Sequence, residues 1–249
     1  MTPLEALGIA AAGFGAGGIN AIVGSGSLIT FPTLLALGYP SVLANVTNTV
    51  GIFPGSFSGV YGYRRELRGQ AGRCVRYGAA TVTGAAGGAI LLLTLPSGVF
   101  DSVVPVLILL ACVLMAVQPW LVRRLTNVHA RKLGVAAVVG VFGTGVYGGY
   151  FGAAQGVILI ALLSVVVDDE LQRLNALKNV LAGLANLVGA IVFVIATHIA
   201  WGAAGLIALG SIIGGQVGAA YGRRIPAKVL RWIVVVAGTA VAVILFTRN

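Results

Sequence analysis

The stretch GFGAGGINAIVGSGSLITFP, from Gly13 to Pro32, lies inside a long apolar segment and determines the fold that we predict. Its twenty residues include six glycines, one asparagine, two serines and one threonine. Lipid offers no hydrogen bonds to a loosened backbone, so such a stretch must be buried in protein or line a polar cavity. A second stretch of this kind, VFGTGVYGGYFGAAQGVILI, runs from Val141 to Ile160. Two glycine-interrupted segments at corresponding places in two halves indicate the binding site of a transporter.

The composition is typical of a polytopic helical membrane protein. The chain has 249 residues, of which 58% are hydrophobic and 9% charged, and its mean hydropathy is +1.01. Several apolar runs reach the ~20 residues that span a bilayer as a helix, and they lack the alternation of barrel strands. Most of the 37 glycines are expected to let helices pack closely. We attribute the net charge of +10 to orientation in the membrane rather than to nucleic-acid binding, because basic residues gather in short loops.

Short polar, basic or proline-marked linkers separate eight apolar segments and leave no room for a soluble domain. The segments are 3–38, 41–63, 74–95, 102–121, 133–167, 174–197, 201–221 and 229–246. The first and fifth are too long for one span, since a helix of about 35 residues extends about 52 Å and the hydrocarbon core is about 30 Å thick. We therefore predict two helix hairpins, 3–22 with 26–38 and 133–151 with 155–167. Their short second arms are either re-entrant or fully spanning.

The two halves of the sequence share the order of their small and polar residues. Gly17 corresponds to Gly145, 128 positions later, and Asn45 corresponds to Asn175, 130 positions later. A two-residue gap in the loop between the segments reconciles the two offsets. We predict an internal duplication within one membrane domain. The predicted repeats are 1–127 and 128–249.

Basic residues gather in three loops, 64–73, 123–132 and 223–231. If each long segment crossed the membrane once, the third loop would lie opposite the first two. If each long segment enters and returns on the same side, all three loops are cytoplasmic, as the positive-inside rule requires. Each half is then a glycine-broken hairpin followed by three transmembrane helices, and the halves have opposite orientations. The predicted fold is an all-α polytopic membrane protein built from two inverted repeats.

The sixth segment carries a cation, Lys178, and apolar sequence follows it. An ionisable residue within the membrane is costly and is by default a functional candidate. Two interpretations stay open: Lys178 binds substrate, or it extends from near the start of its helix to the interface. Asn175 lies on the same helix face as Lys178, and Asn179 lies on the adjacent face.

The first half has an equivalent polar cluster, formed by Asn45, Asn48 and Thr49. Its amides and hydroxyl suit either oxyanion binding or hydrogen bonds between helices. The breaks add backbone groups, because a helix that begins after Gly24 or Gly152 directs unpaired N–H groups and its positive dipole end into the protein. Further candidate substrate-binding residues are Gly24, Ser25, Gly26 and Ser27 in the first half and Gln155 in the second.

Four short stretches carry a family resemblance. They are Gly24 to Pro32 (GSGSLITFP), Ala44 to Thr49 (ANVTNT), Leu174 to Asn179 (LNALKN) and Gly214 to Ala219 (GGQVGA), the last followed by Arg223. With them the chain resembles, over nearly its whole length, the sulfite exporter TauE/SafE family, although Gly152-Ala153-Ala154-Gln155 replaces the glycine-rich core in the second half. The resemblance implies a secondary transporter that moves small sulfur-containing anions, such as sulfite or organosulfonates, usually outward across the cytoplasmic membrane.

The sequence contains no His, Cys, Asp or Glu cluster with metal-ligand spacing, no nucleophile motif and no phosphate loop. We therefore expect no enzyme, catalytic residue, metal, cofactor or nucleic-acid partner; the expected partners are a small anion and the lipid bilayer. Membrane-embedded Asp and Glu are absent, so proton coupling lacks its commonest carrier and the coupling is open. Oligomeric state has no sequence signal. The alternatives are an importer, a channel-like facilitator of another small anion, or a membrane scaffold whose glycines serve packing alone.

Overall fold

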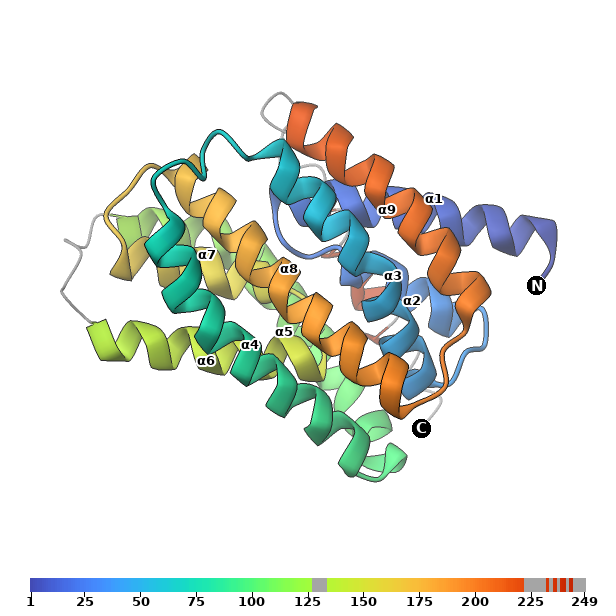
Figure 1. Ribbon diagram of the computed structural model, residues 1–249. Helices are drawn as coiled ribbons and strands as arrows, with labels where there is room; N and C mark the ends of the chain where they lie inside the picture. Colours follow the sequence, from blue (N-terminus) through green and yellow to red (C-terminus); the bar gives the residue numbers. More distant parts are fainter. Residues whose placement is uncertain (127–133, 222–231, 233–234, 237, 241, 244–249) are drawn as a thin grey trace.

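The computed structural model describes residues 1–126 and 134–221, without the side chains of 121–126, and residues 232, 235–236, 238–240 and 242–243 (Figure 1). This part of the chain is built of α-helices joined by short loops and contains no strand. The helices are α1 (Pro3–Ile22), α2 (Ser27–Ala36), α3 (Ser41–Gly62), α4 (Ala71–Thr94), α5 (Ser97–Thr126), α6 (Gly134–Tyr150), α7 (Gln155–Val166), α8 (Leu171–Ala196) and α9 (Trp201–Tyr221). The predicted all-α fold is confirmed.

Five described helices are long and apolar enough to cross a membrane: α1, α4, α8, α9 and residues 97–120 of α5. The chain is therefore a multi-pass membrane protein, as predicted. α3 has 22 residues but is more polar, because the run from Ala44 to Thr49 interrupts its hydropathy. Every residue of that run is buried. The predicted span at 41–63 is thus a helix whose polar face is covered by other helices.

Both predicted helix breaks are present, one between α1 and α2 and the other between α6 and α7. Gly24 has a φ of 86° and Gly152 a φ of 75°, in the left-handed region that glycine adopts without steric cost. Ala154, the residue before α7, has a φ of 59°, which costs a residue with a side chain about 1–2 kcal/mol. The second break therefore stores backbone strain next to the start of α7.

Contacts at one end of the bundle set the direction of the second hairpin. Arg73, near the start of α4, forms an ion pair of 2.5 Å with Asp169 in the loop between α7 and α8. The Arg76 guanidinium donates a hydrogen bond of 2.8 Å to the carbonyl of Gly134, the first residue of α6. α6 therefore begins, and α7 ends, at the end of the molecule that carries the basic loop 64–73.

The first hairpin comes from the opposite end. α3 runs from the basic loop to Ser41, which hydrogen bonds to Asp101 near the start of α5. A pocket at this end is lined by the start of α1 and by residues 37–40, which follow α2. Each hairpin thus begins and finishes at the same end, and the two hairpins use opposite ends. This is the geometry expected of re-entrant hairpins in inverted halves; their placement across a bilayer stays a prediction.

α3 and α8 lie side by side and run in opposite directions between the other helices (Figure 1). α1 packs along α9, which also packs on α3; α6 packs along α4, which also packs on α8. Exchanging α1–α4 with α6–α9 leaves this pattern of neighbours unchanged. The pattern suits two related halves, while the duplication and the boundary between 1–127 and 128–249 remain predictions.

Glycine lets the outer helix pairs touch backbone to backbone. A side chain at Gly214 of α9 would overlap the carbonyl of Phe14 in α1, and one at Gly84 of α4 would overlap the carbonyl of Phe142 in α6. These contacts correspond when the halves are exchanged. Close van der Waals packing of this kind holds transmembrane helices together, so the glycine content serves packing as expected.

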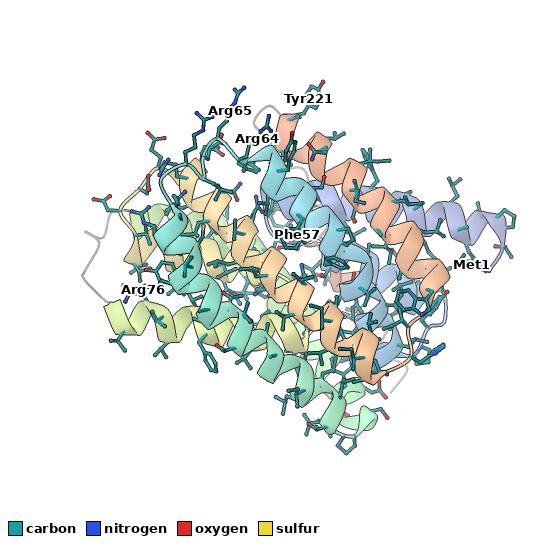
Figure 2. All side chains as sticks on the ribbon, viewed as in Figure 1. Met1, Phe57, Arg64, Arg65, Arg76 and Tyr221 are labelled. Carbon is teal, nitrogen blue, oxygen red and sulfur yellow. The ribbon has the colours of Figure 1, made fainter. Side chains whose placement is uncertain are left out.

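Of the three basic loops, the structure describes 64–73. Figure 2 shows Arg64 and Arg65 at the same end of the molecule as Tyr221, the last residue of α9. The loops 123–132 and 223–231 lie largely outside the described residues, apart from the backbone of 123–126. The cytoplasmic location of all three loops remains a prediction.

Candidate functional site

The two breaks meet inside the bundle. The backbone N–H of Gly156, in the first turn of α7, donates a hydrogen bond of 3.0 Å to the carbonyl of Gly24. A Cβ at either position would overlap the backbone of the other. Direct contact between the hairpin tips therefore requires glycine on both sides.

Lys178 of α8 lies beside this contact and is completely buried, with 0% of its surface exposed. Its Nζ donates a hydrogen bond of 3.3 Å to the carbonyl of Asn20 in the last turn of α1. The interpretation in which Lys178 extends to the interface is therefore wrong. The ammonium faces the negative end of the α1 dipole, and the ion pairs found among the described residues all involve other cations.

Two amides of α8 complete the end of α1. Asn175 and Asn179 both donate from Nδ2 to the carbonyl of Ala21, over 3.3 and 3.2 Å. A helix leaves its last carbonyls without backbone donors, and the polar face of α8 supplies them from the other half of the chain.

The first half repeats this arrangement in the other direction. Asn45 of α3 donates from Nδ2 to the carbonyl of Tyr150, the last residue of α6, over 2.9 Å. Each central helix thus holds the broken helix of the opposite half. The predicted equivalence of Asn45 and Asn175 agrees with this exchange.

The two polar clusters differ in charge. Asn48, which corresponds to Lys178, accepts a hydrogen bond from the hydroxyl of Thr30 in α2. Thr49 donates within its own helix to the carbonyl of Asn45, over 3.0 Å. Of the two breaks, one therefore carries a cation among the side chains that the structure describes.

The remaining candidates divide between the breaks. Ser25 and Ser27 are buried at the start of α2, and a Cβ at Gly26 would overlap the carbonyl of Ala16. Gln155 donates from Nε2 to the carbonyl of Thr144, over 3.2 Å, and so turns back onto its own hairpin. Ser25 and Lys178 lie next to Gly24, at the meeting point, whereas the Gln155 amide is used within α6 and α7.

Two buried polar atoms have no hydrogen-bond partner among the described residues: the Ser25 hydroxyl and Asn45 Oδ1. Both residues are 1% exposed. An unpaired buried polar group costs about 1–3 kcal/mol, so each of these two atoms favours a further partner.

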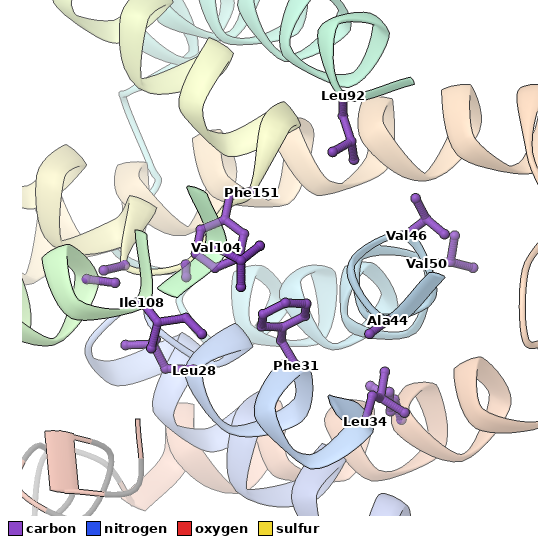
Figure 3. Packing of buried hydrophobic residues seen from close by; sticks show 14 of the residues in the cluster. Leu28, Phe31, Leu34, Ala44, Val46, Val50, Leu92, Val104, Ile108 and Phe151 are labelled. Carbon is purple, nitrogen blue, oxygen red and sulfur yellow. The ribbon is translucent and has the colours of Figure 1, made fainter. Parts of the chain in front are cut away.

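An apolar wall closes one side of the breaks. Phe31 of α2 and Phe151 of the second break meet edge to face, with ring centroids 5.3 Å apart. Figure 3 shows Leu28, Val104 and Ile108 around them. All the predicted substrate-binding residues are buried, so the site is closed to both ends of the molecule.

Sequence reasoning missed a polar contact that joins α1, α3 and α8. Asn20 and Asn186 each donate from Nδ2 to the hydroxyl of Ser56, over 3.1 Å. Ser56 and Asn186 are 130 positions apart, the offset that relates the halves in this region. In the predicted inverted repeats, residues at equivalent positions would touch only at the axis between the halves, so the offset itself was the available signal.

The Tyr147 hydroxyl donates a hydrogen bond of 2.5 Å to the carbonyl of Ala153. It thereby holds the second break to the last turns of α6. The parts of the chain that the structure describes contain no group of three or more His, Cys, Asp or Glu residues that would hold a metal ion.

Fold and site together define a multi-pass membrane protein with two discontinuous helices that meet at a buried polar centre, an architecture that membrane transporters use. Comparison with known families supplies the particular assignment. The family model described as sulfite exporter TauE/SafE matches residues 9–245. The chain belongs to this family.

Curated relatives carry names of the same kind. The chain is 26% identical over 204 residues to the probable membrane transporter protein YfcA of Escherichia coli strain K12, covering 82% of this chain and 75% of that protein. It is 29% identical over 208 residues to a probable membrane transporter protein of Haemophilus influenzae, covering 83% and 81%. A probable membrane transporter protein, ORF9, of a Sinorhizobium species is 27% identical over 234 residues, covering 93% and 88%. No solved structure matches significantly. The chain is a membrane transporter.

Proposed function

We propose that the chain is a secondary transporter that exports small sulfur-containing oxyanions, such as sulfite or organosulfonates, across the cytoplasmic membrane. The description of the family supports the substrate class and the direction. The observation that carries the proposal is Lys178, a fully buried cation at the meeting point of the two breaks.

A buried ammonium without an acidic partner needs compensation, because the effective cost of burying an ion is several kcal/mol. The carbonyl of Asn20 supplies part of it, through a bond of 3.3 Å. An ammonium has three N–H donors, so Lys178 has donors left for an oxyanion. Sulfite and sulfonates present three oxygens to such donors, and the charges of cation and substrate offset each other.

The starts of α2 and α7 add the positive ends of their helix dipoles to this site. Neither helix has a side-chain cap on its first N–H groups. The N–H groups of Gln155, Gly156 and Val157 already donate to backbone carbonyls, so α7 contributes through its dipole, which favours an anion at the start of a helix. Ser25 and Ser27 stand at the start of α2, where their hydroxyls suit the same oxygens.

Transport requires the closed site to open at each end in turn. The hairpins α1–α2 and α6–α7 join at Gly24 and Gly156 and come from opposite ends of the bundle. Withdrawing one tip exposes Lys178 to one end only, and withdrawing the other exposes it to the opposite end. With the basic loops in the cytoplasm, the α6–α7 hairpin is the cytoplasmic gate and the α1–α2 hairpin the external gate.

Flux measurements test this function. The purified chain is reconstituted in liposomes, and movement of labelled sulfite, methanesulfonate, sulfate and chloride is followed with gradients in both directions, against protein-free liposomes. We expect sulfite or methanesulfonate to move fastest. Flux of chloride or sulfate alone would make the chain a facilitator of another anion. Absence of any anion flux in a folded preparation would favour the scaffold alternative.

A further inference from the structure

We propose that Lys178 carries one proton across the membrane together with each substrate anion. Lys178 is then an ammonium while the anion is bound and a neutral amine while the site is empty. The inference deepens the proposed function and rests on it, because it concerns the same site. The sequence left the coupling open, since all six acidic residues lie at or beyond the ends of the apolar segments.

The first step is to find the charges that could face Lys178 from the helices packed around it. α8 packs against α1, α3, α4, α6 and α7. α7 and residues 23–36, which include the first break, contain no ionisable side chain. The other ionisable residues of these helices and of α8 are Glu5, Tyr61, Arg73, Cys74, Arg76, Tyr77, Tyr147, Tyr150 and Arg173. Glu5 is the one carboxylate among them, and it accepts from the backbone N–H of Thr2 at the far end of α1.

The charged groups closest to Lys178 along the chain are paired with one another. Arg73 and Arg173 both form ion pairs with Asp169, in the loop before α8. This loop lies at least two helical turns before Lys178. At the second break, the Tyr147 hydroxyl donates to a backbone carbonyl. Within the part of the chain that the structure describes, Lys178 therefore has no counter-charge.

The second step follows from this isolation. An ammonium that is buried without a counter-charge is costly, so it either binds an anion or loses its proton. A lysine amine can release a proton inside a protein, whereas a guanidinium cannot. A neutral amine retains two N–H groups, and one of them suffices for the bond of 3.3 Å to the carbonyl of Asn20. The charge of Lys178 can therefore change with occupancy while its position is kept.

The third step concerns access of water to the amine. Lys178 is 0% exposed, so its charge state is fixed while the junction between Gly24 and Gly156 is closed. Two closed states avoid an uncompensated charge: the ammonium with the anion, and the amine without it. Because these two states are the favourable ones, the anion and the proton enter from the same side and leave on the same side.

One cycle moves a neutral pair. On the loading side, the amine takes one proton from water, and the resulting ammonium binds the anion. On the release side, the anion leaves and the ammonium returns its proton to water, which regenerates the amine. Because the two charges cancel, the membrane potential does not drive the net movement. Flow follows the product of the anion and proton concentrations, and it runs outward when the anion accumulates in the cell.

The test is uptake of labelled methanesulfonate by liposomes that contain the purified full-length chain. Methanesulfonate is the probe because a sulfonate stays ionised over the working pH range and so carries no proton of its own. Potassium and valinomycin clamp the membrane potential at zero, and the anion starts at equal concentrations on both sides. With the exterior about one pH unit more acidic, we expect the anion to accumulate inside about tenfold, the ratio for one proton per anion.

Lys178→Arg separates proton carrying from anion binding. A guanidinium stays charged inside a protein, so this variant can return across the membrane only with an anion bound. We expect the ratio of pH-driven net flux to anion exchange to fall at least about tenfold. Arg65→Lys, at an exposed position, is the control and should keep the wild-type ratio. If Lys178→Arg does not fold or shows no exchange, accumulation by the wild type decides alone.

Three results would overturn the inference. Methanesulfonate flux that responds to an imposed membrane potential but not to the pH gradient would make the chain a uniporter and leave the proposed function. A wild-type ratio in Lys178→Arg would mean that a permanent charge returns without an anion. Absence of methanesulfonate flux would remove the coupled pair, and sulfite flux in the same liposomes would then decide whether the proposed function survives.

Discussion

The backbone N–H of Gly156 donates to the backbone carbonyl of Gly24 across 3.0 Å, and this bond joins the tips of two hairpins that come from opposite ends of the bundle. The bond involves no side chain. It requires glycine at both positions, because a Cβ on either residue would overlap the other residue. The buried Lys178 lies beside this junction, so the packing of the tips and the proposed substrate site share one place.

Gly156→Ala should separate the hairpin tips. The added Cβ meets backbone atoms of Gly24, which cannot rotate away as a flexible side chain would. Overpacking of this kind costs about 1–3 kcal/mol, so we expect a lower midpoint of thermal unfolding and reduced anion flux. The unfolding midpoint is measured on the purified protein, and the anion flux is measured in liposomes.

Gly143→Ala is the matched control for this substitution. Gly143 lies in α6 of the same hairpin, and a Cβ there meets nothing within 4 Å. Alanine is favoured over glycine in a helix by about 1 kcal/mol, so stability should stay the same or rise. An equal loss of stability in both variants would contradict the role of the Gly24 contact.

Asn175→Ala and Asn179→Ala should show a more than additive effect on stability. Both amides donate to the carbonyl of Ala21, so either one alone still pairs it. Removing both leaves a buried carbonyl unpaired, at a cost of about 1–3 kcal/mol. A double-mutant cycle on the free energy of unfolding measures the coupling. Simple additivity would show that the amides do not share this acceptor.

Asp169→Asn should loosen the end of the bundle that carries the loop 64–73. Burial alone would raise the pKa of the Asp169 carboxyl, but hydrogen bonds from Arg73 and Arg173 outweigh it and hold the pKa below its usual value. The lowered pKa means that the contribution to stability is present above about pH 4, the value for the unfolded chain, and is lost as the pH falls through the folded-state pKa.

The measurement is the difference in the free energy of unfolding between the wild type and Asp169→Asn as a function of pH. We expect a difference of about 1 kcal/mol at neutral pH, which vanishes in acid below pH ~4. Asp168→Asn is the control, since Asp168 is exposed and takes part in none of the ion pairs of the described residues. A difference that grows as the pH falls would contradict the ion pairs.

Much of the fold could be predicted because its signals are local. Glycine content and excess length indicated the breaks, and the helices end and begin within a few residues of the predicted positions. The polar run in α3 was visible as well. Its burial was not, because it depends on which helices cover it.

The side-chain partners could not be predicted for a physical reason. Lys178, Asn175 and Asn179 bind backbone carbonyls of α1, and a carbonyl has no sequence signal. The repeat offset of 128 makes Gln155 the equivalent of Ser27. The Gln155 side chain nevertheless folds back over Gly148, where a Cβ would overlap it. Residues at equivalent positions thus have different partners, because the space around them differs.

The central claim is that Lys178 binds the substrate anion where the two halves meet. Its most direct test is sulfite binding and flux by Lys178→Met, which keeps the volume of the side chain and removes the charge. The relief from burying an unpaired ion, several kcal/mol, offsets the loss of its hydrogen bond to the Asn20 carbonyl, about 1–3 kcal/mol, so the fold should stay intact. The surface variant Arg65→Met is the control for the change in net charge.

We expect sulfite affinity and flux of Lys178→Met to fall about 10- to 100-fold, the value of a charge-assisted hydrogen bond, with no loss of thermal stability and no change in Arg65→Met. Wild-type sulfite affinity and flux in a folded Lys178→Met protein would contradict the account.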